Sequence, residues 1–136
     1  MQGHNDWLKK SLSDLKMAKK GLKDDDDTLD CVVYHSHQCA EKALKSYFVF
    51  KNKGLERTHD LEYLLKMCSE IDFDFLILKD DVKKLNPFSV QSRYPDDRFY
   101  IDREEAEYTI KIAKKIFDFV ENKIENPDKN MNIFKH

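Results

Sequence analysis

The chain has 136 residues, with 24 basic and 26 acidic side chains and a formal net charge of -2. This length favours one domain, residues 1–136, that buries a core without disulfides, and the charge balance excludes a chain that binds nucleic acid through basic composition alone. Three glycines and three prolines are too few for the turns of an all-β fold, and no stretch approaches the roughly 20 apolar residues that cross a membrane.

Hydrophobic periodicity predicts two long helices in the first half of the chain. The first spans about residues 6–22, with Gly21 near its end. We interpret the acidic run at 23–27 as an exposed connection, because a cation site needs oxygens from several turns of chain. The second helix begins at Thr28, a predicted N-cap, and ends near Gly54. Its wide apolar face predicts a central helix with several neighbours.

Three more helices are predicted in the second half. The third begins after Thr58, which we expect to be its cap, and the fourth stops before Pro87. Residues 88–100 contain a proline and have no helical period, so they form a long loop. Asp102 resembles the cap of a capping box and begins the fifth helix, which ends at Pro127.

These elements predict an all-α fold. Short connections between long amphipathic helices are typical of antiparallel neighbours. We therefore predict an up-and-down helical bundle of four main helices plus a short fifth. Its core covers about residues 5–125, and residues 126–136 form a flexible tail.

The second helix carries polar side chains at helical spacing. His35, Gln38, Lys42 and Lys45 follow one another at steps of three, four and three, so they share one face. One interpretation is that this face presents a binding surface. The other is that Glu41 pairs with Lys45, that Lys42 is merely exposed, and that His35 and Gln38 satisfy one another or a nearby backbone group.

The long loop supplies the second candidate element of a site. Arg93 has the donor geometry that suits phosphate, and Tyr94 has a ring that can stack on a base. The alternative is that Arg93 pairs with Glu41 or Asp96 and fixes the loop in place. The sequence leaves both interpretations open.

Metal and thiol chemistry are not predicted. His35 and His37 are two residues apart, roughly 200 degrees around a helix, so they cannot share one ion. Cys39 lies among apolar neighbours and is expected to pack as a small hydrophobic side chain. The three cysteines form no CxxC pair and indicate reduced thiols in a cytoplasmic protein. We predict no metal and no cofactor.

Three motifs in one order resemble the HEPN domain, named for higher eukaryotes and prokaryotes nucleotide-binding. They are Tyr-His-Ser-His-Gln-Cys-Ala-Glu-Lys-Ala-Leu-Lys at 34–45, Thr-His-Asp-Leu at 58–61 and Arg-Tyr-Pro-Asp at 93–96, and Trp7, Ala18, Glu105 and Ala106 accompany them. The family pattern usually has Gln at the position of His37 and Ala at that of Cys39. Both differences are compatible with a helix.

The resemblance implies a helical bundle that forms a homodimer in the cytoplasm. HEPN proteins bind nucleotides, are encoded beside a small nucleotidyltransferase, or act in toxin–antitoxin pairs. The nuclease branches use an Arg followed after four to six residues by a His. No arginine of this chain has a histidine at that spacing, including Arg57, Arg93, Arg98 and Arg103. We therefore assign no catalytic residue.

The leading hypothesis is a non-catalytic dimeric module that binds a nucleotide or another phosphate-bearing ligand, that partners a nucleotidyltransferase, or both. The expected ligand-binding residues are His35, Gln38, Lys42, His59, Arg93 and Tyr94, and Glu41 and Asp96 form a supporting polar network. One alternative is a metal-independent ribonuclease toxin in which His59 or His35 acts as base and Arg93 stabilises the transition state. The other is a structural dimeric adaptor.

Overall fold

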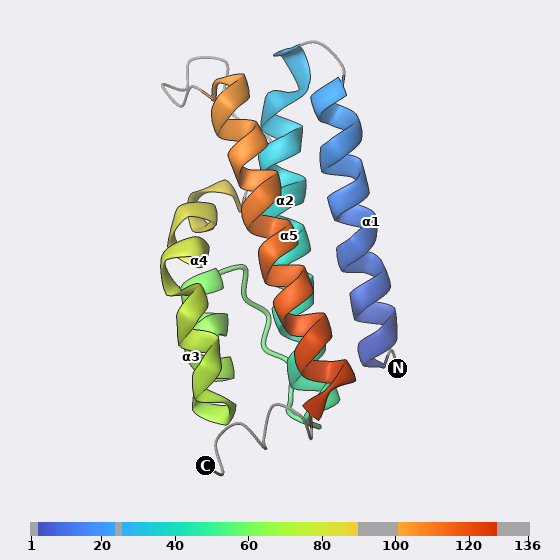
Figure 1. The fold of residues 1–136 in the computed structure, drawn as a ribbon, viewed down its shortest axis with the longest axis vertical. Helices are drawn as coiled ribbons and strands as arrows, with labels where there is room; N and C mark the ends of the chain where they lie inside the picture. The colour runs from blue at the N-terminus through green and yellow to red at the C-terminus, as the bar shows by residue number, and fades with distance from the viewer. Residues whose placement is uncertain (1–2, 24–25, 90–100, 128–136) are drawn as a thin grey trace.

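The computed structural model describes residues 3–23, 26–89 and 101–127 (Figure 1). Every regular element in these ranges is helical, which confirms the all-α prediction. The α-helices are α1 (His4–Lys23), α2 (Leu29–Phe50), α3 (Leu61–Ile71), α4 (Lys79–Leu85) and α5 (Arg103–Glu125). Short 3-10 turns cover Asp26–Thr28, Phe73–Leu78 and Asn86–Phe88. No helix in the described ranges is long and apolar enough to cross a membrane.

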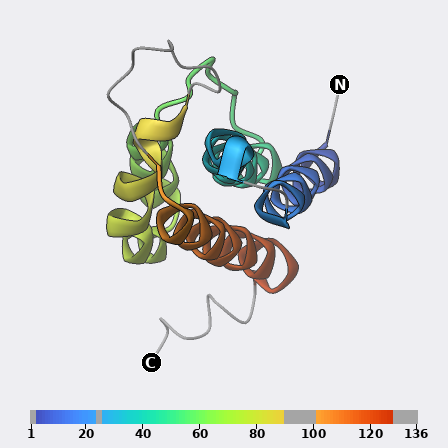
Figure 2. The same cartoon turned by 90° about the horizontal axis from the view of Figure 1, so that it is seen from above.

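Helix α2 is the centre of the bundle. Figure 2 shows α1 on one side of α2 and α3 with α4 on the other, while α5 covers a third side. Most side chains of α2 are consequently buried, among them Val32, Ala40 and Leu44, which are fully buried. Burial of a side chain such as Val32 or Leu44 contributes roughly 1.5–3 kcal/mol. The wide apolar face of the sequence therefore corresponds to a helix with neighbours on several sides.

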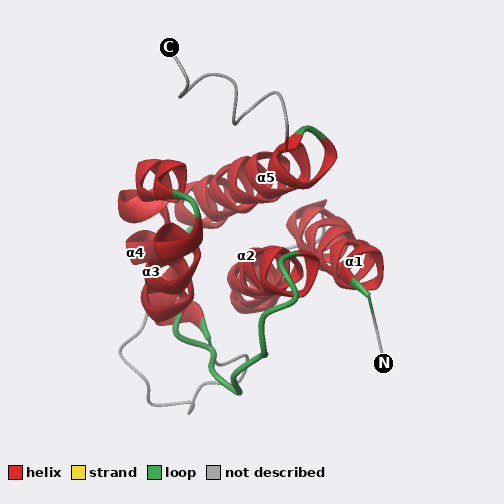
Figure 3. Ribbon diagram, turned by 90° about the horizontal axis from the view of Figure 1, so that it is seen from below, coloured by secondary structure: helices red, strands yellow, loops and turns green. Residues whose placement is uncertain are grey.

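The segment between α2 and α3 is a feature that hydrophobic periodicity did not predict. Residues 51–60 run back along α2, so that α2 and α3 point in the same direction (Figure 1). Figures 2 and 3 place this segment on the side of α2 away from α5. It begins with a tight turn in which Asn52 has a positive φ of 57° and the Lys53 N–H donates to the Phe48 carbonyl at 2.8 Å. The segment thereby carries its last residues to the middle of α2.

Gly21 sets the close approach of α1 to α2. It lies within the last turn of α1, and a Cβ at this position would come within 2.9 Å of the Val32 side chain. Thr28 does not cap α2 as predicted, because its hydroxyl donates to the Gly21 carbonyl at 2.6 Å. Gly21 and Thr28 therefore connect the end of α1 to the start of α2, through close packing and a hydrogen bond.

The predicted N-cap of α3 is wrong, whereas that of α5 is confirmed. Asp60, rather than Thr58, caps α3 by accepting hydrogen bonds from the backbone N–H groups of Glu62 and Tyr63. The Thr58 hydroxyl accepts instead from the Asp60 N–H at 3.1 Å. Asp102 caps α5, as predicted, by accepting from the backbone N–H of Glu105 at 2.7 Å. Side-chain caps satisfy N–H groups that the first helical turn leaves without partners.

Candidate functional site

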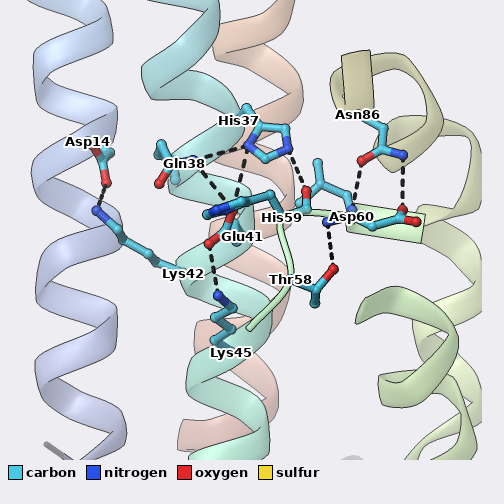
Figure 4. Close-up of polar contacts among 12 residues, drawn as sticks. Asp14, His37, Gln38, Glu41, Lys42, Lys45, Thr58, His59, Asp60 and Asn86 are labelled. Carbon is cyan, nitrogen blue, oxygen red and sulfur yellow. Dashed lines mark hydrogen bonds and ion pairs between the residues drawn. The ribbon is translucent and has the colours of Figure 1, made fainter. Parts of the chain in front are cut away.

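The polar side chains of α2 form two clusters that face different neighbours (Figure 4). The Asp14 cluster consists of Asp14, His35 and Lys42 and joins α2 to α1. The Glu41 cluster consists of His37, Gln38, Glu41, Lys45 and His59, and joins α2 to the segment 51–60. The spacing predicted that His35, Gln38, Lys42 and Lys45 share one face, whereas the structure divides them between two partners.

In the Asp14 cluster, one carboxylate binds two side chains of α2. Asp14 Oδ1 lies 2.8 Å from His35 Nδ1, and Asp14 Oδ2 lies 2.6 Å from Lys42 Nζ. Asp14 is buried, whereas the His35 and Lys42 side chains are partly exposed. The interpretation that Lys42 is merely exposed is therefore wrong, because its ammonium group forms an ion pair between two helices.

In the Glu41 cluster, a buried carboxylate accepts three hydrogen bonds. Glu41 is 3% exposed, and its oxygens lie 2.9 Å from Lys45 Nζ, 2.9 Å from His59 Nδ1 and 3.4 Å from Gln38 Nε2. Burial by itself raises the pKa of this carboxyl, but the hydrogen bonds from Lys45 and His59 outweigh it and hold the pKa below 4.5. The predicted pairing of Glu41 with Lys45 is confirmed.

His37 is fully buried beside this carboxylate. Its Nε2 donates to the carbonyl oxygen of His59 at 3.0 Å, so Nδ1 is the unprotonated nitrogen and lies 3.4 Å from Gln38 Nε2. Burial lowers the pKa of His37 to about 4, and the nearby Glu41 carboxylate offsets only part of that effect. His37 is therefore neutral at neutral pH and holds the backbone of residue 59 in place.

His59 is the exposed member of the Glu41 cluster. Its side chain is 69% exposed, although its Nδ1 contacts the buried carboxylate of Glu41. With Nδ1 bound in this way, Nε2 is the nitrogen left for a ligand or a proton. The cluster thus presents one oriented imidazole at the surface.

Asn86 fixes the residues that follow His59, and the sequence reading missed it. Its side chain donates to Asp60 Oδ1 at 3.0 Å and accepts from the Leu61 N–H at 2.7 Å. The available signal was the position of Asn86 directly before Pro87, where a helix ends. Asn86 joins the start of α3 to the end of α4.

The structure places four of the six expected ligand-binding residues. His35 and Lys42 point toward α1, whereas Gln38 and His59 meet at Glu41. The other two, Arg93 and Tyr94, lie outside the described residues, as does Asp96 of the expected polar network. The described residues therefore include only the α2 side of the cleft expected between α2 and residues 88–100.

Cys39 of α2 is buried, and its thiol is not arranged for catalysis. Cys39 is fully buried, and burial raises the pKa of its thiol to about 12, so it is not a nucleophile at neutral pH. Its sulfur lies 3.4 Å from the hydroxyl of Ser11 on α1. Across residues 3–23, 26–89 and 101–127, no three His, Cys, Asp or Glu side chains are grouped to hold a metal ion.

Comparisons with known proteins agree with this architecture. The HEPN domain family model matches residues 4–123. The chain is 26% identical to the crystal structure of ST0689, an archaeal HEPN homologue, with a TM-score of 0.72 over 91% of this chain and 99% of that one. It is 27% identical to the crystal structure of TT1696 from Thermus thermophilus, with a TM-score of 0.74 over 90% of this chain and 99% of that one. No curated protein matches. The chain, a helical bundle whose central helix carries two polar clusters, belongs to the HEPN domain family.

Proposed function

We propose that this HEPN domain is a non-catalytic dimeric module that binds a nucleotide or another phosphate-bearing ligand where His59 meets α2, that partners a small nucleotidyltransferase, or both. The observation that carries the proposal is the exposed imidazole of His59, which the buried carboxylate of Glu41 holds at 2.9 Å. A surface imidazole that a buried carboxylate orients is typical of a group that contacts a ligand or a substrate.

The surroundings of His59 support a rigid contact. The carboxylate of Glu41 is itself fixed by Lys45, and the carbonyl of His59 is fixed by His37. The next residue, Asp60, caps α3 and is bound by Asn86. Side chain and backbone are both held before a ligand arrives, so binding costs less conformational entropy.

The remaining contacts belong to the family motif at residues 93–96. We assign the main phosphate contact to Arg93 and base stacking to Tyr94, because the two lysines of the α2 face are already paired. Lys42 binds Asp14, and Lys45 binds Glu41. An arginine fork forms two parallel hydrogen bonds to phosphate, which a paired lysine cannot match.

An exposed apolar surface supports the dimer. Phe73 is 77% exposed and Ile77 is 68% exposed, and Leu76 between them is 42% exposed. All three lie in the 3-10 turn Phe73–Leu78, which is held to α5 by the 2.8 Å ion pair between Asp72 and Lys123. Apolar side chains gathered on a fixed surface element are typical of a protein interface, and we assign this one to a second copy of the chain.

Titration with ATP, GTP and short RNA tests the proposal, on protein whose mass is measured by light scattering. We expect saturable binding by a dimer, and we expect His59→Ala and Arg93→Ala each to weaken it about tenfold, the effect of one lost charge-assisted hydrogen bond. His4→Ala, which changes a histidine at the start of α1, is the matched control and should leave affinity unchanged. A monomer without saturable binding would contradict the proposal.

The pairing of Glu41 with His59 also favours a second function, that of a metal-independent ribonuclease. With Nδ1 bound to a carboxylate, Nε2 of His59 could accept the proton of a ribose hydroxyl while Arg93 stabilises the charged transition state. The same variants decide between the two functions. RNA that the wild type cuts and His59→Ala leaves intact would establish the nuclease, and RNA left intact by both would exclude it.

A further inference from the structure

A cleft of about 440 Å³ lies between the C-terminal turns of α1 and the N-terminal half of α5. Its lining residues are Lys19, Leu22, Lys23, Arg103, Glu107, Ile110 and Lys111. Figure 1 shows these ends of α1 and α5 together at one end of the bundle. The cleft is separate from the proposed His59 site, because the segment 51–60 lies on the side of α2 away from α5 (Figures 2 and 3).

The cleft concentrates positive charge on a protein whose net charge is negative. Among the described residues of its lining, four side chains are cations and Glu107 is the one anion. Arg103 is fixed, because its guanidinium binds Asp26 at 3.2 Å, donates to the carbonyl of Leu22 and lies 3.8 Å from Glu107. In the described part of the chain, no carboxylate forms an ion pair with Lys19 or Lys111. These ammonium groups remain available to an external anion.

The remaining described surface of the cleft is aliphatic. Leu22 and Ile110 provide it, and among the described residues the lining contains no aromatic ring, side-chain amide or hydroxyl. Such a surface offers no partner for the hydrogen-bonding edge of a base and no ring for stacking. It does suit a saturated or branched hydrocarbon group, which would bury apolar area against it.

We infer that this cleft binds a small molecule that carries two or more negative charges beside an aliphatic body, such as the diphosphate ester of an aliphatic alcohol. The cations of Lys19 and Lys111, unpaired among the described residues, meet the charged group. Leu22 and Ile110 cover the hydrocarbon. The volume lies within the range of small-molecule pockets.

Calorimetric titration with pyrophosphate, ADP and geranyl diphosphate at low salt tests the inference. Geranyl diphosphate should bind at least about tenfold more tightly than pyrophosphate, since burying two methylene groups contributes this much. The double variant Lys19→Ala/Lys111→Ala should weaken both ligands by about tenfold or more. Leu22→Ser should remove the advantage of geranyl diphosphate and leave pyrophosphate binding unchanged.

Matched variants separate this cleft from general charge effects and from the His59 site. Lys9→Ala/Lys66→Ala removes two exposed lysines outside the cleft and should leave affinity unchanged. His59→Ala should also leave it unchanged, whether or not the proposed function at His59 is correct. The inference is overturned if geranyl diphosphate shows no saturable binding or binds no better than ADP. It also fails if either of these variants weakens binding as much as the cleft variant does.

Discussion

The free energy of unfolding should fall by about 3 kcal/mol as the pH drops from 6.5 to 4, and His37→Gln should remove most of that fall. Burial of the imidazole lowers the pKa of His37 from 6.5 to about 4. Between these values the unfolded chain binds a proton at His37 that the folded chain does not. Acid therefore favours unfolding over this range, and the effect fades as the pH rises above 6.5.

Glutamine is the informative replacement. Its amide can donate to the His59 carbonyl, as His37 Nε2 does at 3.0 Å, but it does not titrate. Gln also stands at this position in the usual family pattern. Urea unfolding followed by circular dichroism from pH 4 to pH 7.5 measures the effect. His4→Gln, which replaces a histidine that is only partly buried, should keep the wild-type slope. Parallel curves for the wild type and His37→Gln would show that His37 is protonated in the folded protein.

Glu41→Ala should destabilise the protein by roughly 3–5 kcal/mol, the cost of breaking a buried ion pair by removing one partner. Lys45 is only 8% exposed, and its ammonium group would lose the carboxylate that lies 2.9 Å away. Gln38 and His59 would each lose an acceptor as well. Denaturant unfolding at pH 7 measures the loss, and Glu70→Ala, on the exposed face of α3, should change stability by less than about 0.5 kcal/mol.

A double variant tests whether the uncompensated charge is the cause. Glu41→Leu/Lys45→Met replaces both ions with apolar side chains of similar length, and it should recover most of the stability that Glu41→Ala loses. If the double variant were as unstable as Glu41→Ala, the lost packing and the unpaired Gln38 and His59 would account for the effect.

The pH range over which Glu41 affects stability differs from that of His37, because the pKa of Glu41 is held below 4.5. Its stabilising contribution is therefore lost only in more acidic solution.

Hydrophobic periodicity predicted the helices because an apolar stripe depends only on local spacing. In α5 the apolar residues Ala106, Ile110, Ala113, Phe117 and Val120, which are three or four positions apart, are all buried. The cap of α3 was less certain from sequence, since Thr58 and Asp60 are both good capping residues two positions apart. The structure uses both, with Thr58 binding the N–H of Asp60 and Asp60 capping the helix.

The candidate site was only partly predictable, for a physical reason. Helical spacing shows that His35 and Lys42 share a face, but not that Asp14 of another helix lies opposite them. A glutamate in a polar stripe suggests an exposed residue, whereas Glu41 is buried because His59 and Lys45 satisfy it. Such burial depends on a backbone path through residues 51–60 that periodicity does not specify.

The length of the segment 51–60 fixes the position of His59 relative to α2. Its first end is set by the left-handed turn at Asn52, and its last end by the bonds that Asn86 makes to Asp60 and Leu61. Between two anchored ends, a residue added or removed would shift the imidazole of His59 away from its carboxylate. An ordinary surface loop tolerates such changes in length. In this domain the number of residues between α2 and α3 determines whether the imidazole of His59 reaches the carboxylate of Glu41.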